Sequence, residues 1–268
     1  MVSTSLLGKP RVDCQTRGMT DGSVGTSATG VWATLGEPRT TVELAGSGFD
    51  WLCLDAQHGH FDDATLRAVF ALRRSAATTV LVRVAAPDPT LIGRALDVGA
   101  DGVIVPMVND AAAAEACVAA AHYPPRGTRS WGPLRGAGLR DLERDGSSPG
   151  EARPFCAVMV ETADAVAEID AIVATRDLDM VFVGPFDLSL ALGRDVDELL
   201  ADFGENATLP RIVRACERVG IRAGAYAGSP ERAKVLNRQG FSWIAVTTDV
   251  GVVQLGSEEA RARAATGP

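Results

Sequence analysis

The sequence has no surplus of positive charge. Lysine and arginine together number 26 against 34 aspartates and glutamates, which gives a formal net charge of −8 and a pI near 5.0. No basic run offsets this balance, and an acidic chain repels the phosphates of nucleic acids and of anionic membranes. We therefore expect neither a nucleic-acid partner nor a membrane partner.

Paired cysteines and clustered histidines are also missing. The five cysteines stand singly, without a CxxC pair, and we expect reduced thiols that pack as small hydrophobes. Three histidines do not make a His-rich transition-metal site. We find neither a basic segment followed by an apolar one, as in a secretory leader, nor a run long enough to cross a bilayer. The cytoplasm is the expected location.

What the chain does contain is a regular alternation of short apolar runs and segments of helical period. Runs of Val, Ile and Leu without polar alternation are typical of parallel strands that are buried on both faces. The predicted strands are Gly30–Leu35, Trp51–Asp55, Val80–Val84, Gly102–Pro106, Cys156–Glu161, Met180–Gly184, Arg222–Tyr226 and Trp243–Thr247. The predicted helices are Thr65–Arg74, Thr90–Val98, Ala111–Ala121, Ala163–Val173, Pro210–Val219 and Glu231–Arg238.

Eight such strand–helix units in 268 residues favour one domain with the (β/α)8 (TIM) barrel fold, over residues 29–268. An open, doubly wound sheet is the alternative. Residues 1–28 are polar and rich in Gly, Ser and Thr, and we interpret them as a lead-in to the domain. The stretch 122–154 is long for a connection, and long loops in compact domains are usually functional or disordered.

Reactive groups of a (β/α)8 enzyme lie at the carboxyl ends of its strands, so the residues that close each apolar run are the candidates. Ionisable and aromatic side chains gather there: Trp32 in the first run, Asp55 with Gln57 and His58 after the second, Arg83 in the third, Glu161 after the fifth, and Gly184-Pro185-Phe186-Asp187 after the sixth.

Glu161 and Asp187 close adjacent predicted strands, which lie about 4.8 Å apart in a sheet. Two carboxylates without His or Cys partners suit a hard divalent cation, whose remaining ligands are waters or substrate oxygens. The pair therefore predicts a metal site. The alternative is that Asp187 caps a helix.

The other candidates suggest how a 2-oxo acid would be held. The N–H groups of Phe186 and Asp187 open a predicted helix, and such N–H groups bind carboxylates. Arg83, a cation within an apolar strand, would stabilise a developing enolate; the alternative is a structural ion pair with Asp55, and the two roles are compatible. His58 is the candidate acid/base, since its pKa lies near working pH; Asp55 would orient its ring or hold a metal-bound water.

These residues lie in motifs that resemble one family, HpcH/HpaI aldolase/citrate lyase, typified by 4-hydroxy-2-oxoheptanedioate aldolase. The resemblance covers roughly Gly30 to Asp249. Its motifs are Gly48-Phe49-Asp50-Trp51 followed by Asp55-x-Gln57-His58, Val82-Arg83, Asp97-Val98-Gly99-Ala100, Val105-Pro106-Met107-Val108, Tyr123-Pro124-Pro125-x-Gly127-x-Arg129, Glu161-Thr162 and Gly184-Pro185-x-Asp187-Leu188-Ser189.

The resemblance implies a class II aldolase, a carbon–carbon lyase that cleaves 4-hydroxy-2-oxo acids to pyruvate and an aldehyde through an enolate on a divalent cation, as in aromatic compound catabolism. Carried across, Glu161 and Asp187 would bind Mg2+, Mn2+ or Co2+, and His58, paired with Asp55, would move the hydroxyl proton. Arg83 would hold the enolate and the amides of Phe186 and Asp187 the carboxylate.

The resemblance extends to the rest of the pocket and to assembly. Trp32, Gln57, Gly184 and Pro185 would line the substrate pocket. Members of the family are typically hexamers, trimers of dimers whose last helix packs on a neighbouring barrel, and the segment Val250–Ala265 would play that part.

Two residues depart from the family pattern. Gln57 stands where many members carry Glu, and Met159 replaces a polar Gln. Both departures affect the expected substrate more than the expected reaction. The first competing hypothesis is a lyase for CoA thioesters of the citramalyl or malyl type, which would need a basic patch for the CoA phosphates; the pole at the carboxyl ends of the strands is expected to supply only Arg126, Arg129 and Arg135 for it. The second is a non-catalytic barrel that binds a small acid.

Overall fold

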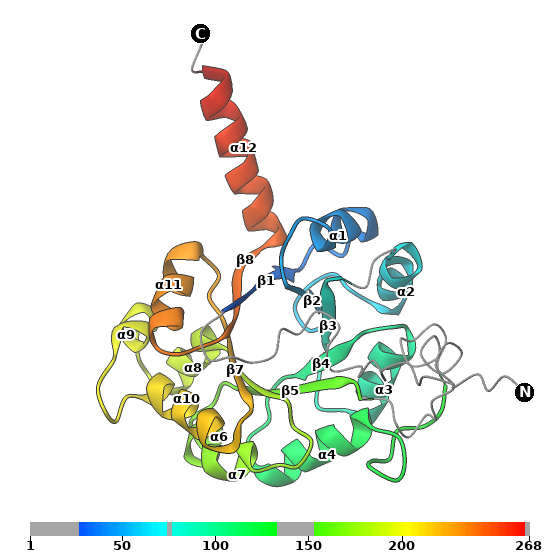
Figure 1. The fold of residues 1–268 in the computed structure, drawn as a ribbon, viewed down its shortest axis with the longest axis vertical. Coiled ribbons are helices and arrows are strands. Elements are labelled where there is room, and N and C mark those ends of the chain that lie inside the picture. The colour runs from blue at the N-terminus through cyan, green and yellow to red at the C-terminus, as the bar shows by residue number, and fades with distance from the viewer. Residues whose placement is uncertain (1–26, 74–76, 133–152, 266–268) are drawn as a thin grey trace, which may run out of the picture.

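The computed structural model describes residues 27–73, 77–132 and 153–265 (Figure 1). Its parallel strands follow one another in sequence order around a closed barrel, and β1 pairs with β8 to complete the circle. The (β/α)8 prediction is confirmed and the open sheet is excluded. The strands are β1 (Ala28–Ala33), β2 (Trp51–Asp55), β3 (Thr79–Arg83), β4 (Gly102–Val105), β5 (Phe155–Val160), β6 (Met180–Val183), β7 (Arg222–Tyr226) and β8 (Trp243–Thr248).

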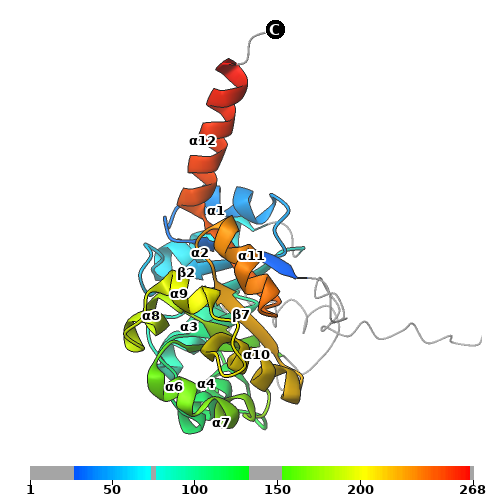
Figure 2. The ribbon, with the colours of Figure 1, turned by 90° about the vertical axis from the view of Figure 1, so that its left-hand side faces the viewer.

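Helices follow the strands and surround the barrel (Figures 1 and 2). They are α1 (Pro38–Ala45), α2 (Asp63–Leu72), α3 (Pro89–Asp97), α4 (Ala111–Ala121), α6 (Ala163–Ala167), α7 (Ile169–Val173), α8 (Pro185–Ala191), α9 (Val196–Ala201), α10 (Thr208–Val219), α11 (Pro230–Arg238) and α12 (Asp249–Ala265). The helix expected over Ala163–Val173 is divided at Glu168, and α1 and α9 were not predicted. Both are short, eight and six residues, so they offer little helical periodicity to detect.

The helix starts follow local chemistry. Asp62, Asp88 and Asp110 each precede a helix and accept hydrogen bonds from N–H groups of its first turn, which have no partner within the helix. Pro210 was expected to open its helix, but α10 begins two residues earlier, at Thr208. A proline is tolerated there because the N–H groups of the first turn make no intrahelical bond.

Two apolar cores hold the barrel together, one between strands and helices and one inside the barrel. The inner core contains a column of aromatic rings that runs from the amino ends of the strands towards the carboxyl ends: Phe155, Trp243, Trp51, Phe182 and Trp32, with successive centroids 5.3–6.0 Å apart. Trp51 and Phe182 meet edge-on, and the other neighbouring pairs are stacked. A Cβ at Gly30 would lie 2.1 Å from the Trp51 ring, so only glycine leaves room for this stack. The interior is thus filled, and Trp32 forms its last layer below the carboxyl-end loops.

Helix α12 leaves the barrel at the carboxyl end of β8 and projects away from it (Figures 1 and 2). Asp249 is its buried residue, and Val253 and Leu255 are half-exposed. The last helix expected at Val250–Ala265 is therefore present. None of the helices in the described ranges has the length and apolar character needed to cross a membrane.

Most of the predicted lead-in, residues 1–26, and the loop 133–152 lie outside the described residues. Of the long stretch 122–154, residues 122–132 and 153–154 are described. The Pro-Pro-Arg-Gly segment follows α4 and precedes β5, so it lies at the amino ends of the strands. Arg129 there donates to Asp97 at the end of α3 (2.7 Å) and stacks on Tyr123 (4.5 Å). The expectation that Arg126 and Arg129 lie at the pole of the candidate site is wrong, because α4 returns the chain to the amino ends of the strands before it reaches these residues. Arg135 lies outside the described residues.

Candidate active site

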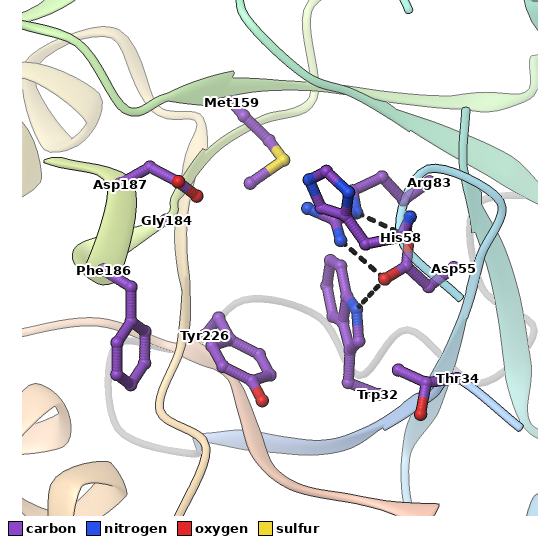
Figure 3. Close-up of a pocket in the computed structure, with 10 residues that line it drawn as sticks. All are labelled: Trp32, Thr34, Asp55, His58, Arg83, Met159, Gly184, Phe186, Asp187 and Tyr226. Atoms are coloured by element: carbon purple, nitrogen blue, oxygen red, sulfur yellow. Dashed lines mark hydrogen bonds and ion pairs between the residues drawn. The ribbon is translucent and has the colours of Figure 1, made fainter. Parts of the chain in front are cut away.

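A pocket opens at the carboxyl ends of the strands, above Trp32 (Figure 3). Its lining residues come from the ends of β1, β2, β3, β5, β6 and β7 and the turns that follow them. They are Trp32, Thr34, Asp55, His58, Arg83, Met159, Gly184, Phe186, Asp187 and Tyr226. The rule that selects the residues closing the strands therefore located the pocket correctly.

One wall of the pocket is an ion pair between neighbouring strands. Parallel pairing places Asp55 of β2 beside Arg83 of β3. The Arg83 Nε donates to Asp55 Oδ1 at 2.9 Å and Nη2 donates to Oδ2 at 2.5 Å, with both side chains buried. Trp32 adds a third donor, its Nε1, at 3.2 Å from Oδ2, and the Arg83 guanidinium lies 5.0 Å from the Trp32 ring centroid. The three side chains form one hydrogen-bonded unit.

The charges in this unit stabilise each other. Burial acts to raise the pKa of Asp55, but the hydrogen bonds and positive charge of Arg83 outweigh it and hold that pKa below its usual range. Burial likewise acts to lower the pKa of Arg83, and Asp55 outweighs it, so that pKa is raised. Both groups are charged at neutral pH, and the guanidinium has a fixed orientation at the floor of the pocket.

His58 lies on the turn after β2, exposed at the mouth of the pocket, where Figure 3 shows its ring in front of Arg83. Asp55 Oδ1 accepts from the backbone N–H groups of Gln57 and His58, at 3.0 and 3.1 Å. Asp55 therefore shapes the turn that carries His58, through the main chain. Gln57 is half-buried and, with Pro185, is not among the residues that line the pocket.

Across the pocket, Glu161 follows β5 and is buried behind Gly184. A Cβ at position 184 would lie 2.9 Å from Glu161 Oε2, so glycine is needed for this approach. Glu161 Oε1 accepts from the N–H of Met107 at 2.7 Å, and Met107 holds a left-handed backbone with φ 56°. Burial raises the pKa of Glu161; the Met107 N–H opposes that shift and the Asp187 charge adds to it.

Asp187 lies in the first turn of α8, and its carboxylate points into the pocket (Figure 3). The residue that precedes this helix, Gly184, has no side chain to cap it, and Pro185 has no N–H. The N–H groups of Phe186 and Asp187 therefore have no partner within the helix. This corner of the pocket offers two hydrogen-bond donors next to two carboxylates.

Glu161 and Asp187 form a pair of carboxylates rather than part of a larger cluster of acidic side chains. Among the described residues, no group of three or more His, Cys, Asp or Glu side chains is arranged to hold a metal ion. The pKa of Glu161 is raised mainly by burial, and the negative charge of Asp187 adds to that shift. The oxygen donors of the pair match a hard cation that completes its shell with water or substrate.

The remaining wall is aromatic. Trp32 meets Tyr226 edge-on at 5.5 Å, and Tyr226 meets Phe186 at 5.8 Å. Burial raises the pKa of the Tyr226 phenol, and no side chain or backbone group of the described residues hydrogen-bonds its hydroxyl. Met159, which stands where the family pattern has a polar residue, lies across the pocket from these rings, with its Cε 3.1 Å from the position of a Cβ at Gly184 (Figure 3).

Thr34 and Tyr226 were missed as pocket residues. Both follow the rule that was applied to the other strands: Tyr226 closes the seventh apolar run, and Thr34 follows Ala33 at the end of the first. Their uncharged side chains did not mark them as candidates for chemistry. Met107 contributes through its backbone N–H, which donates to Glu161, and a backbone contact of this kind cannot be inferred from the type of residue.

Comparisons with known proteins point to one family. The family model for HpcH/HpaI aldolase/citrate lyase matches residues 28–254. A 2-dehydro-3,6-dideoxy-6-sulfogluconate aldolase from Pseudomonas putida is 31% identical over 237 residues, with 86% of this chain and 89% of that protein covered. A 5-keto-4-deoxy-D-glucarate aldolase from Shigella boydii is 31% identical over 238 residues, with the same coverage.

A crystal structure of an HpcH/HpaI aldolase/citrate lyase family protein from Burkholderia cenocepacia is similar throughout. Its TM-score to this chain is 0.78 at 29% identity, with 90% of this chain and 95% of that one covered.

Proposed function

We propose a reaction for this chain from the premise that it belongs to the HpcH/HpaI aldolase/citrate lyase family and is a carbon–carbon lyase. The reaction is the cleavage of 4-hydroxy-2-oxo acids to pyruvate and an aldehyde, and its reverse. The observation that supports it is a pocket that contains a fixed guanidinium, an exposed histidine and the Asp187 carboxylate, with the buried carboxylate of Glu161 next to it behind Gly184.

Glu161 and Asp187 would hold a divalent cation, for which Mg2+, Mn2+ and Co2+ are the candidates. The donor set fits, because both side chains offer only oxygen ligands, and burial together with the Asp187 charge disfavours the negative charge of Glu161, which a cation would stabilise. A bound cation would act as a Lewis acid on the ketone of the substrate.

The chain itself would orient the 2-oxo acid. The N–H groups of Phe186 and Asp187 would bind its carboxylate, as helix starts bind anions. Arg83 would donate to the ketone oxygen, where negative charge develops when the enolate forms. Because Asp55 already holds the guanidinium on two atoms, this donor needs no rearrangement when substrate arrives.

His58 would move the proton. In cleavage it takes the proton of the C4 hydroxyl, directly or through water, while the C3–C4 bond breaks and the C4 oxygen becomes the aldehyde carbonyl. The electron pair of the broken bond forms the enolate of pyruvate, and protonation at C3 then gives the methyl group. Exposure at the mouth of the pocket suits a group that exchanges protons with solvent.

The side of the pocket that would receive the aldehyde is formed by Trp32, Tyr226 and Phe186. The P. putida and S. boydii relatives are named for acids with a sulfonate or second carboxylate. The side assigned to the aldehyde here presents aromatic rings, and Met159, on the opposite side beside Gly184, adds no polar group. We therefore expect a preference for aldehydes with an uncharged substituent.

Deuterium exchange of pyruvate tests the proposal. In D2O with Mn2+, the enzyme should replace the methyl protons of pyruvate, followed by NMR, and chelation with EDTA should stop the exchange. Cleavage of a 4-hydroxy-2-oxo acid, followed through pyruvate release, should show the same dependence on the cation. Absence of exchange with Mg2+, Mn2+ and Co2+ would refute the catalytic proposal and favour a binding barrel; cleavage confined to CoA thioesters would favour the thioester lyase.

The exposed α12 supports a homo-oligomer, and we propose the hexamer, a trimer of dimers, in which α12 packs on a neighbouring barrel. A groove beside its first turns is lined by residues that include the apolar Leu44, Val252 and Val253 and the acidic Glu43 and Asp249. Light scattering coupled to gel filtration should give six copies for the wild type and fewer for Leu255→Glu. A monomer at micromolar concentration would contradict the proposal.

A further inference from the structure

Asp249 is a buried carboxylate at the carboxyl end of β8, at the first residue of α12, with 4% exposure. Its Oδ2 accepts from the N–H groups of Thr34 and Leu35, each at 2.8 Å. Its Oδ1 accepts from the Thr34 hydroxyl and from the N–H of Val250, both at 3.0 Å. Three of these four bonds cross from the last strand–helix junction to the first.

Other aspartates at helix starts make a different pattern. Asp88 accepts from Thr90 and Leu91, and Asp195 accepts from Asp197 and Glu198, all within their own helices. Asp249 instead accepts three of its four hydrogen bonds from a segment that lies 214 or 215 residues away in the sequence. Helix capping alone therefore does not account for this residue.

The segment that Asp249 holds touches both the pocket and the turn that carries His58. Thr34 lines the pocket. Its carbonyl oxygen accepts from the N–H of His60 at 2.8 Å. A Cβ at Gly59 would lie 3.0 Å from that carbonyl oxygen and 2.5 Å from the carbonyl oxygen of Asp55, so the two turns pack backbone on backbone.

We infer that Asp249 is a positioning residue for the aldol reaction. It fixes Thr34 and Leu35, and through the Thr34 carbonyl it fixes the turn on which His58 stands. It touches none of the groups that would hold the 2-oxo acid. The expected effect on catalysis rests on the proposed function. The structural link between the turn after β1 and the turn after β2 does not depend on it.

The chemistry predicts a selective defect. In Asp249→Asn the amide nitrogen that replaces one oxygen cannot accept, so the N–H groups of Thr34 and Leu35 lose their charged acceptor. The His58 turn would loosen, whereas Glu161, Asp187 and Arg83 keep their own partners. Cleavage, which needs His58, should fall about 10- to 100-fold, the usual effect of losing a supporting contact. Deuterium exchange of pyruvate should stay within about twofold of wild type, since distant, uncoupled groups behave independently.

The experiment compares Asp249→Asn, Thr34→Val, the double variant and a matched control, Asp88→Asn. The control makes the same change at a helix start on the same pole, where the lost contacts stay within one helix. Thr34→Val retains the Asp249 charge and removes only the hydroxyl bond, so it tests the link even where Asp249→Asn folds poorly. Three quantities are measured: backbone hydrogen exchange of residues 33–36 and 56–61, cleavage kcat, and pyruvate deuteration.

Support requires faster hydrogen exchange in both segments for Asp249→Asn but not for Asp88→Asn, with cleavage lost and deuteration retained. The double variant should be no slower than Asp249→Asn alone, because both changes break one contact. Unchanged protection at 56–61 overturns the positioning link, whatever the activity. If Asp249→Asn loses cleavage and deuteration equally, Asp249 does not act selectively on His58. If the effects of the two substitutions add in the double variant, Asp249 does not act through Thr34. A wild type without either activity refutes the proposed function, while the hydrogen exchange still decides the link.

Discussion

The two sides of the pocket differ in how far their charges are balanced within the chain. On the β1–β3 side, Asp55 and Arg83 neutralise each other through two direct bonds, and Trp32 and two backbone N–H groups complete the coordination of Asp55. On the β5–β6 side, Glu161 receives one N–H and faces a second negative charge, that of Asp187. The first side is a closed network, and the second is an open one.

Under the proposed function, this difference would separate the rigid part of the pocket from the part that binds the cation. A closed network keeps its geometry without a ligand, which suits a donor that must be oriented before the reaction. An open pair of carboxylates is unfavourable alone and becomes favourable when a cation arrives. Substitutions on the closed side should therefore lower stability, and substitutions on the open side should lower cation binding.

The largest effect is expected for Glu161→Gln, on the open side. Loss of one of two charged ligands should reduce Mn2+-dependent pyruvate deuteration about 10³-fold, equivalent to several kcal/mol of transition-state stabilisation. The melting temperature should stay equal or rise, because a buried charge is removed. Glu168→Gln, at an exposed glutamate, is the control. Unchanged Mn2+ affinity in titration calorimetry would refute the ligand assignment.

His58→Ala tests the group between the two sides. Removing an acid/base should lower cleavage kcat about 10²- to 10⁴-fold, while Mn2+ affinity should not change, because His58 is not one of the proposed ligands. Steady-state kinetics and calorimetry measure the two quantities. Equal losses in both would indicate a structural histidine.

Asp55→Asn breaks the closed side. It should destabilise the fold by about 3–5 kcal/mol at pH 7, because Arg83 is left as a buried charge without its partner. The pKa of Asp55 is lowered in the folded state, so its contribution is complete above the ordinary aspartate pKa and is lost as the pH falls through the folded-state value.

Urea unfolding should therefore show a gap between wild type and Asp55→Asn that is widest near neutrality and narrows below about pH 4. Asp63→Asn, in an exposed pair with Arg67, should change stability by less than about 1 kcal/mol. A gap that is constant with pH would contradict the ion-pair account.

The smallest effect is expected at Tyr226, on the aromatic wall. Tyr226→Phe removes a hydroxyl without a partner among the described residues, and kcat/KM should fall about two- to tenfold for aldehydes that offer it a hydrogen bond. For aldehydes with a purely apolar substituent, kcat/KM should stay unchanged. Tyr226→Leu, which also removes the ring, separates the contribution of the hydroxyl from that of the ring. If Tyr226→Phe lowers kcat/KM equally for both classes of aldehyde, the hydroxyl does not take part in substrate recognition.

Much of the site was predictable because a parallel barrel gathers the ends of its strands at one pole. Asp55, Arg83, Glu161 and Asp187 were identified as residues that close apolar runs, and all four lie at that pole. The ion pair between Arg83 and Asp55, which was the alternative interpretation of Arg83, is observed. It is compatible with the proposed role of the guanidinium, because it fixes the orientation of that group. The contact of Asp55 with the His58 backbone N–H was not foreseen, because the course of a turn depends on packing and not on residue type.

The sequence by itself determined the eightfold alternation, the barrel and the position of the charged candidates, since hydrophobic periodicity and the direction of parallel strands are local properties that repeat along the chain. Only the tertiary structure decided that Tyr226 and Thr34 complete the pocket and that Arg129 pairs with Asp97 at the amino ends of the strands. It also decided that Asp249 accepts hydrogen bonds from the turn after β1. These are contacts between residues far apart in sequence, and closure of the barrel, which joins β8 to β1, brings the last of them together.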